Sequence, residues 1–115
     1  MTSLEPISLS SHVLDLQTGA PAAGLHIHLH RDAHAGVLSE AVTDADGRVR
    51  DWPAAGELPP GRYRLTFAVG AWFDARGVDS FYDEIVLPFR ALEGGAHYHV
   101  PLLLSPFGYS TYRGS

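Results

Sequence analysis

Chain-breaking residues restrict this sequence more than any other feature, because its 115 residues include 12 glycines and 8 prolines. Glycine weakens the interior of a helix and proline breaks it, so a bundle of long helices is excluded. The apolar fraction of 45% still permits a packed core. We therefore expect one domain over residues 1–115, made of short segments joined by turns, with residues 1–6 as a flexible N-terminal tail.

Alternation of apolar and polar residues marks the strands. Over residues 25–31 it is strict: three aliphatic side chains point one way and three histidines the other. Looser patterns predict further strands at residues 7–16, 37–43, 62–69, 84–92, 97–104 and 109–113, and one short helix at 72–79. Pro88 lacks an N–H and must lie at an edge, a bulge or a strand end, and Pro101 is a second proline inside a strand-like run. The pattern predicts an all-β fold, an antiparallel β-sandwich.

Charge and cysteine content exclude several classes of function. The net charge is -5, and the eight basic residues, all arginine, are scattered along the chain. Binding to nucleic acid or to an anionic membrane is therefore not expected. The absence of cysteine excludes disulfides, thiolate zinc sites and a cysteine nucleophile. With no apolar run long enough to span a bilayer and no basic leader, we expect a cytoplasmic protein.

The seven histidines offer several candidate sites. His26, His28 and His30 lie about 7 Å apart along one strand face; two could share a metal, but three on a straight strand cannot converge, and a solvated face is the simpler reading. His97 and His99 form a second His-x-His pair, either a polar face, an adventitious zinc site or the wall of a cleft. The apolar run that follows this pair favours the cleft.

The local sequence pattern does not decide the roles of two further residues, His12 and Arg48. His12 interrupts the apolar alternation of the first strand, as a hydrogen-bonded structural residue or as a catalyst. Asp44 and Asp46 before Gly47 lack the other ligands of a calcium loop and read as a tight turn. Arg48 follows this turn, and its guanidinium suits a carboxylate or an acidic ring. No serine-nucleophile elbow, zinc-protease helix or phosphate-binding loop is present.

The C-terminal run, residues 97–115 (HYHVPLLLSPFGYSTYRGS), resembles the signature of the 5-hydroxyisourate hydrolase family, the transthyretin-related enzymes of urate breakdown. The first strand at residues 11–15, with Thr18-Gly19 after it, resembles the family's other signature, and residues 43–48 and 63–67 match between them. The resemblance implies a transthyretin-like two-sheet sandwich with one short helix. It also implies a homotetramer, a dimer of dimers whose central channel carries the active sites.

The same resemblance implies the reaction and the residues that perform it. The substrate would be 5-hydroxyisourate, and opening one cyclic amide bond would give 2-oxo-4-hydroxy-4-carboxy-5-ureidoimidazoline, without metal or organic cofactor. The implied catalytic residues are His12, Arg48, His99 and Tyr112, and the implied substrate-binding residues are His12, Arg48, Tyr112 and Ser115. We expect a histidine, His99 in the first place, to activate water and Arg48 to stabilise the developing charge.

Three rival functions remain at this point. A transthyretin-type carrier would hold a small ligand in the same channel without catalysis. Transthyretin itself shares the fold but lacks the terminal Tyr-Arg-Gly-Ser and the catalytic histidines. A structural sandwich module of a surface protein and a histidine-based metal carrier are the other two. Polar side chains at His12, Arg48 and His99 favour the enzyme over the carrier.

Overall fold

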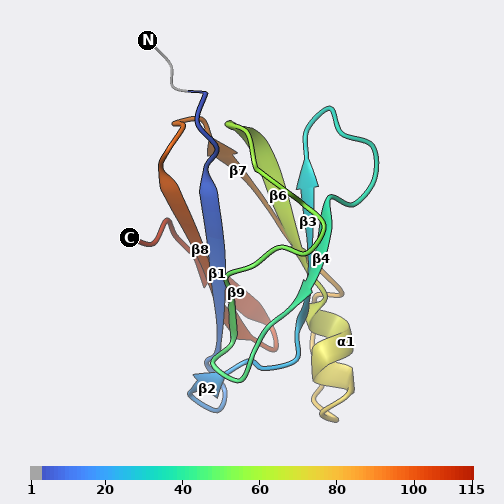
Figure 1. Cartoon of the computed structure of the whole chain (residues 1–115). Coiled ribbons are helices and arrows are strands. Elements are labelled where there is room, and N and C mark those ends of the chain that lie inside the picture. Colours follow the sequence, from blue (N-terminus) through green and yellow to red (C-terminus); the bar gives the residue numbers. More distant parts are fainter. Residues whose placement is uncertain (1–3) are drawn as a thin grey trace.

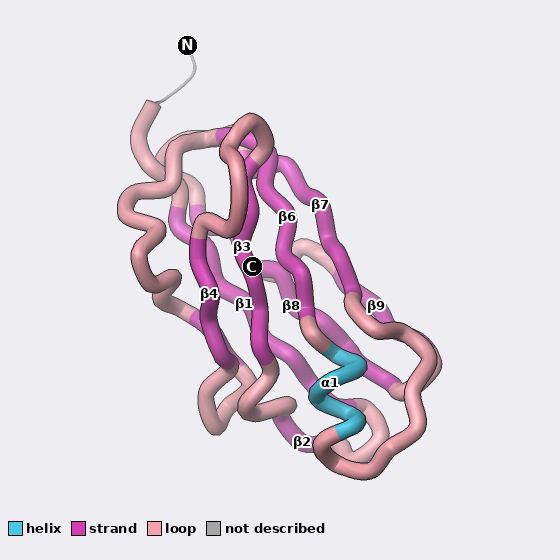
Figure 2. Tube along the Cα trace, turned by 90° about the vertical axis from the view of Figure 1, so that its right-hand side faces the viewer, coloured by secondary structure: helices cyan, strands magenta, loops and turns pink. Residues whose placement is uncertain are grey.

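The computed structural model describes residues 4–115, which form two β-sheets packed face to face (Figure 1). The first sheet has the order β2 (Ala20–Pro21), β1 (Ser8–Asp15), β8 (His97–Ser105), β9 (Gly108–Thr111), and β5 (Arg48–Val49) also pairs with β1. The second has the order β4 (Ser39–Val42), β3 (His26–Arg31), β6 (Gly61–Phe67), β7 (Ile85–Ala91). One helix, α1 (Val69–Asp74), covers one end of the second sheet (Figure 2). The predicted two-sheet sandwich with one short helix is confirmed.

The pairing of β1 with β8 departs from a wholly antiparallel sheet. These two strands run parallel along their length, with Ser8 opposite His97 and Asp15 opposite Leu104. The other strand pairs in the two sheets are antiparallel. Because parallel neighbours need a long crossover, the whole second sheet lies between β1 and β8 in the sequence. This crossover places an N-terminal strand directly beside a C-terminal one.

The core lies between the two sheets and follows the predicted alternation. Ile27 and Leu29 of β3 are fully buried, whereas the three histidines of that strand point outward. On the facing sheet, Val13 of β1 and Leu102 of β8 are also fully buried. Since inward and outward side chains alternate along a strand, the outer face of β1 and β8 is left for polar residues.

The helix begins earlier than the sequence pattern predicts. It spans Val69–Asp74 rather than residues 72–79, because Val69, Trp72 and Phe73 share one helical face and bury it in the core. The chain after it turns at Gly77, whose φ of 67° is in the left-handed region that favours glycine. Val69 therefore belongs to the helix and not to the preceding strand.

The two strand prolines occupy different positions. Pro88 lies in β7, the edge strand of the second sheet, as predicted. Pro101 lies within β8, which continues through it to Ser105. Leu102 pairs with Thr111, and the same register carried three residues further pairs His99 with Gly114. The pairing of β8 with the C-terminal segment is interrupted between these two pairs, beside Pro101, which has no N–H to donate.

The predicted tail at residues 1–6 falls partly outside the described residues, which begin at residue 4. The Pro6 carbonyl accepts a hydrogen bond from the Gly95 N–H at 3.2 Å, and Ile7 pairs with Leu58. The single-domain assignment stays a prediction. Within the described range, no helix is long and apolar enough to cross a membrane.

Candidate active site

Three neighbouring strands build a polar cleft on the outer face of the first sheet. His12 of β1 lies opposite Arg48 of β5 on one side, and opposite Pro101 of β8 on the other. His99, two residues before Pro101, shares this outer face, with its Cα about 8 Å from that of His12 by sheet geometry. The cleft has a volume of about 610 Å³, and Arg48, His97, His99 and Ser115 are among its lining residues.

The turn before β5 fixes Arg48. One carboxylate oxygen of Asp44 accepts hydrogen bonds from the backbone N–H groups of Asp46 at 2.9 Å and Arg48 at 3.0 Å. Gly47 has a φ of 73°, and a Cβ there would lie 2.5 Å from the Val13 carbonyl oxygen. Only glycine fits this turn, and the predicted tight turn is confirmed.

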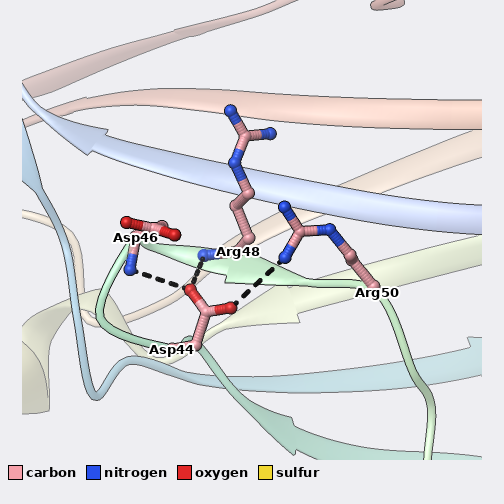
Figure 3. Close-up of polar contacts among 4 residues, drawn as sticks. All are labelled: Asp44, Asp46, Arg48 and Arg50. Atoms are coloured by element: carbon pink, nitrogen blue, oxygen red, sulfur yellow. Dashed lines mark hydrogen bonds and ion pairs between the residues drawn. The ribbon is translucent and has the colours of Figure 1, made fainter.

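The guanidinium of Arg48 is left available to a ligand. Figure 3 shows it extending away from Asp44 and Asp46, whereas Arg50 reaches back to the other Asp44 oxygen at 3.5 Å. Among residues 4–115, no carboxylate forms an ion pair with Arg48. A cation without a carboxylate partner in a polar cleft can bind an anionic ring or an oxyanion.

His12 is a half-buried neighbour of this cation. Burial lowers the pKa of the His12 imidazole below the ordinary histidine value, and the charge of Arg48 lowers it further. His12 does not itself line the cleft of about 610 Å³, but its charge acts on His99, whose pKa it also lowers. The structure therefore brings His12, Arg48 and His99 to one face of one sheet.

His99 is held from two sides. Its Nδ1 lies 2.7 Å from the Ser10 hydroxyl, and its carbonyl accepts the Gly114 N–H at 2.8 Å. Burial, followed by the charge of Arg48, lowers the pKa of the His99 imidazole. A neutral imidazole whose Nδ1 is occupied has Nε2 as its remaining site for proton transfer.

Two serines that the sequence analysis missed complete the polar face. Ser10 bridges His97 and His99, and Ser8 contacts the other nitrogen of His97. Their signal was present in the sequence, because Ser8 and Ser10 precede His12 by four and two residues. On a strand this spacing places all three on the same face.

The structure separates Tyr112 from Ser115. Ser115 lines the cleft with His97 and His99. The Tyr112 side chain is 59% exposed and lines a second hollow of about 260 Å³, between β7 and the C-terminal segment. His99 lines this second hollow as well as the cleft, and the predicted role of Tyr112 in the site stays a prediction.

The remaining histidine cluster lies elsewhere. His26, His28 and His30 are on β3 of the second sheet, outside the cleft, and His28 lies 3.8 Å from Glu40. Burial lowers the pKa of His30. Over the described part of the chain, no group of three or more histidine, cysteine or acidic side chains is arranged to hold a metal ion. The cleft itself presents imidazole, guanidinium and hydroxyl groups, which suit acid–base chemistry.

Comparison with known proteins shows the family to which the chain belongs. The sequence profile of the HIUase/Transthyretin family matches residues 9–114, nearly the whole chain. The chain belongs to this family. The matched range contains four of the five predicted site residues, and the fifth, Ser115, directly follows it.

Relatives in the family include named hydrolases and a transthyretin. The 5-hydroxyisourate hydrolase of Salmonella dublin is 46% identical over 110 residues, covering 93% of this chain and 80% of the relative. The structure of Klebsiella pneumoniae 5-hydroxyisourate hydrolase matches with a TM-score of 0.82 and 44% identity, over 94% of this chain and 99% of that one. Transthyretin from Sparus aurata matches with a TM-score of 0.85 but 31% identity, over 93% and 96%. The transthyretin-like fold is thereby confirmed.

Proposed function

We propose that this protein hydrolyses 5-hydroxyisourate to 2-oxo-4-hydroxy-4-carboxy-5-ureidoimidazoline, a step of urate and hence purine catabolism. The observation that carries the proposal is the pairing of an anchored imidazole, His99, with a carboxylate-free guanidinium, Arg48, in one cleft. Two relatives that are 46% and 44% identical over more than nine-tenths of the chain bear the name of this hydrolase. The reaction needs a base for water and a cation for the developing oxyanion, and these two groups can supply them.

In the proposed mechanism, Nε2 of His99 accepts a proton as water adds to a ring carbonyl carbon. Arg48 stabilises the negative charge that forms on the carbonyl oxygen. The ring C–N bond then breaks, and the proton passes to the leaving nitrogen, with His12 sharing or relaying it. The lowered pKa of His99 supports this role because the imidazole stays neutral, and able to accept a proton, at neutral pH.

Substrate binding is proposed to involve His12, Arg48, Tyr112 and Ser115. Ser115 lies at the cleft and needs no rearrangement to contact a ligand there. Tyr112 lines the neighbouring hollow, and His99 lines both hollows, so we propose that Tyr112 contacts a substrate held at His99. We also propose a homotetramer, a dimer of dimers, acting in the cytoplasm; light scattering after size-exclusion chromatography tests the tetramer.

The alternative is a transthyretin-type carrier of a small ligand. Such a carrier is expected to present an apolar site, and the hollow beside Tyr112 has apolar walls that include Leu87 and Val100. The cleft at Arg48 and His99 instead carries charged and polar side chains beside apolar ones such as Trp52 and Leu58. A carrier binds its ligand without turnover, so catalysis discriminates between the two functions.

The deciding experiment follows the ultraviolet absorbance of freshly generated 5-hydroxyisourate with and without the purified protein. We expect rapid decay with the wild type and a fall in kcat of about 100-fold in His99→Ala, as for loss of a general base. His34→Ala, at an exposed turn, is the matched control and should keep wild-type turnover. Decay no faster than the spontaneous reaction would rule out the hydrolase, and normal turnover in His99→Ala would remove this residue from the mechanism.

A further inference from the structure

A continuous chain of hydrogen-bonding groups runs along the outer face of β1 and β8. The Ser8 hydroxyl lies 2.6 Å from Nδ1 of His97, whose Nε2 lies 2.9 Å from the Ser10 hydroxyl. The same hydroxyl lies 2.7 Å from Nδ1 of His99. The parallel register produces this order, since it sets Ser8 opposite His97 and Ser10 opposite His99.

Counting hydrogens shows why Ser10 matters. A serine hydroxyl has one hydrogen, so of the two imidazole nitrogens facing Ser10 at least one must itself carry a hydrogen. If Ser10 donates to His97, Nδ1 of His99 must donate to Ser10, and Nε2 of neutral His99 keeps its lone pair. If Ser10 donates to His99 instead, the hydrogen of neutral His99 lies on Nε2, which then cannot accept a proton.

We propose that Ser10 and His97 are positioning residues that hold His99 in the tautomer with its hydrogen on Nδ1, leaving Nε2 as the base. This inference rests on the proposed hydrolase function. Arg48 lines the same cleft, and a nearby cation favours a lone pair over an N–H on the nitrogen left free. Ser8 completes the chain by accepting the Nδ1 hydrogen of His97.

Nitrogen-15 NMR of the histidine side chains tests the tautomer without reference to activity. In the wild type at neutral pH we expect the His99 hydrogen on Nδ1, and in Ser10→Ala a mixture of both tautomers. Ser10→Thr keeps a hydroxyl and should restore the wild-type pattern. A His99 hydrogen on Nε2 in the wild type, or an unchanged tautomer in Ser10→Ala, would overturn the inference.

Kinetics with 5-hydroxyisourate give the second readout. Ser10→Ala should lower kcat about 10-fold, as for other residues that orient a functional imidazole, and leave KM within about 2-fold. Ser10→Thr should recover most of the loss, and Ser80→Ala, in the loop between α1 and β7, serves as the serine control. Unchanged kcat in a folded Ser10→Ala protein would contradict the role. If the wild type itself has no activity, the proposed function fails, while the NMR result still decides the tautomer.

The His97 position is tested through the same tautomer. A glutamine carbonyl can accept the Ser10 hydrogen in place of Nε2 of His97, so His97→Gln should keep the His99 hydrogen on Nδ1. His97→Phe offers no acceptor to Ser10 and should give a mixture of both tautomers. An unchanged His99 tautomer in a folded His97→Phe protein would remove His97 from this chain of hydrogen bonds.

Discussion

Replacing Gly114 with alanine perturbs the proposed site through a single methyl group. A Cβ at this position would lie 2.4 Å from Cδ2 of His99 and 3.1 Å from its Cγ. Carbon atoms in contact prefer separations of about 3.5 Å or more, so the imidazole and the new methyl must separate by about 1 Å. The backbone of Gly114 is tied to His99 by an N–H···O bond of 2.8 Å, so the clash falls on the ring.

The expected effect follows from this displacement. A shift of about 1 Å in a catalytic group costs on the order of 100-fold in rate, about 2.7 kcal/mol of transition-state stabilisation. The fold should survive, because Gly114 lies outside the core and its φ is not in the left-handed region. Gly108 is the matched control: it lies in the same C-terminal segment, and a Cβ there would meet nothing within 4 Å.

The assay measures kcat/KM on 5-hydroxyisourate for Gly114→Ala and Gly108→Ala, with circular dichroism and thermal unfolding as checks on the fold. We expect Gly108→Ala within about 2-fold of the wild type, as for a neutral surface substitution, and Gly114→Ala about 100-fold lower. Equal activity of the two folded variants would refute the reasoning, because the position of the His99 ring would then not matter to the reaction.

Three further predictions concern charge and buried hydrogen bonds. Burial lowers the folded-state pKa values of His12, His30 and His99. The unfolded chain therefore binds more protons, and the free energy of unfolding in urea should fall as the pH drops below 6.5; a rise on acidification through that range would contradict this. Arg48→Gln removes a cation that lowers the pKa of His99, so that pKa should rise in an NMR titration, and an unchanged or lower value would show the coupling to be absent. Thr43→Val leaves a buried N–H and a buried carbonyl without their hydroxyl partner, and should cost about 2 kcal/mol in urea unfolding; a loss under about 0.5 kcal/mol would count against this account.

Local chemistry in the chain was enough to predict much of this molecule. The period-two pattern over residues 25–31 assigned Ile27 and Leu29 to the core, and the Asp-Gly turn before Arg48 was recognised from its residues. Pro88, which lacks an N–H, was predicted at an edge, a bulge or a strand end, and it lies in an edge strand. Each of these depends on neighbours within a few residues, which the sequence displays directly. The predicted helix bounds, 72–79, were wrong because the burial of Val69 outweighed the local sequence pattern.

The arrangement of the cleft depended on contacts that are distant along the chain. The strand pattern indicates which face a side chain takes, but not which strands become neighbours or whether they run parallel. The pairing of β1 with β5 and β8 brought His12 beside Arg48, and set Ser10 between His97 and His99. Tertiary structure alone decided these contacts, because a strand's hydrogen bonds and its buried face are satisfied by partners far away in sequence.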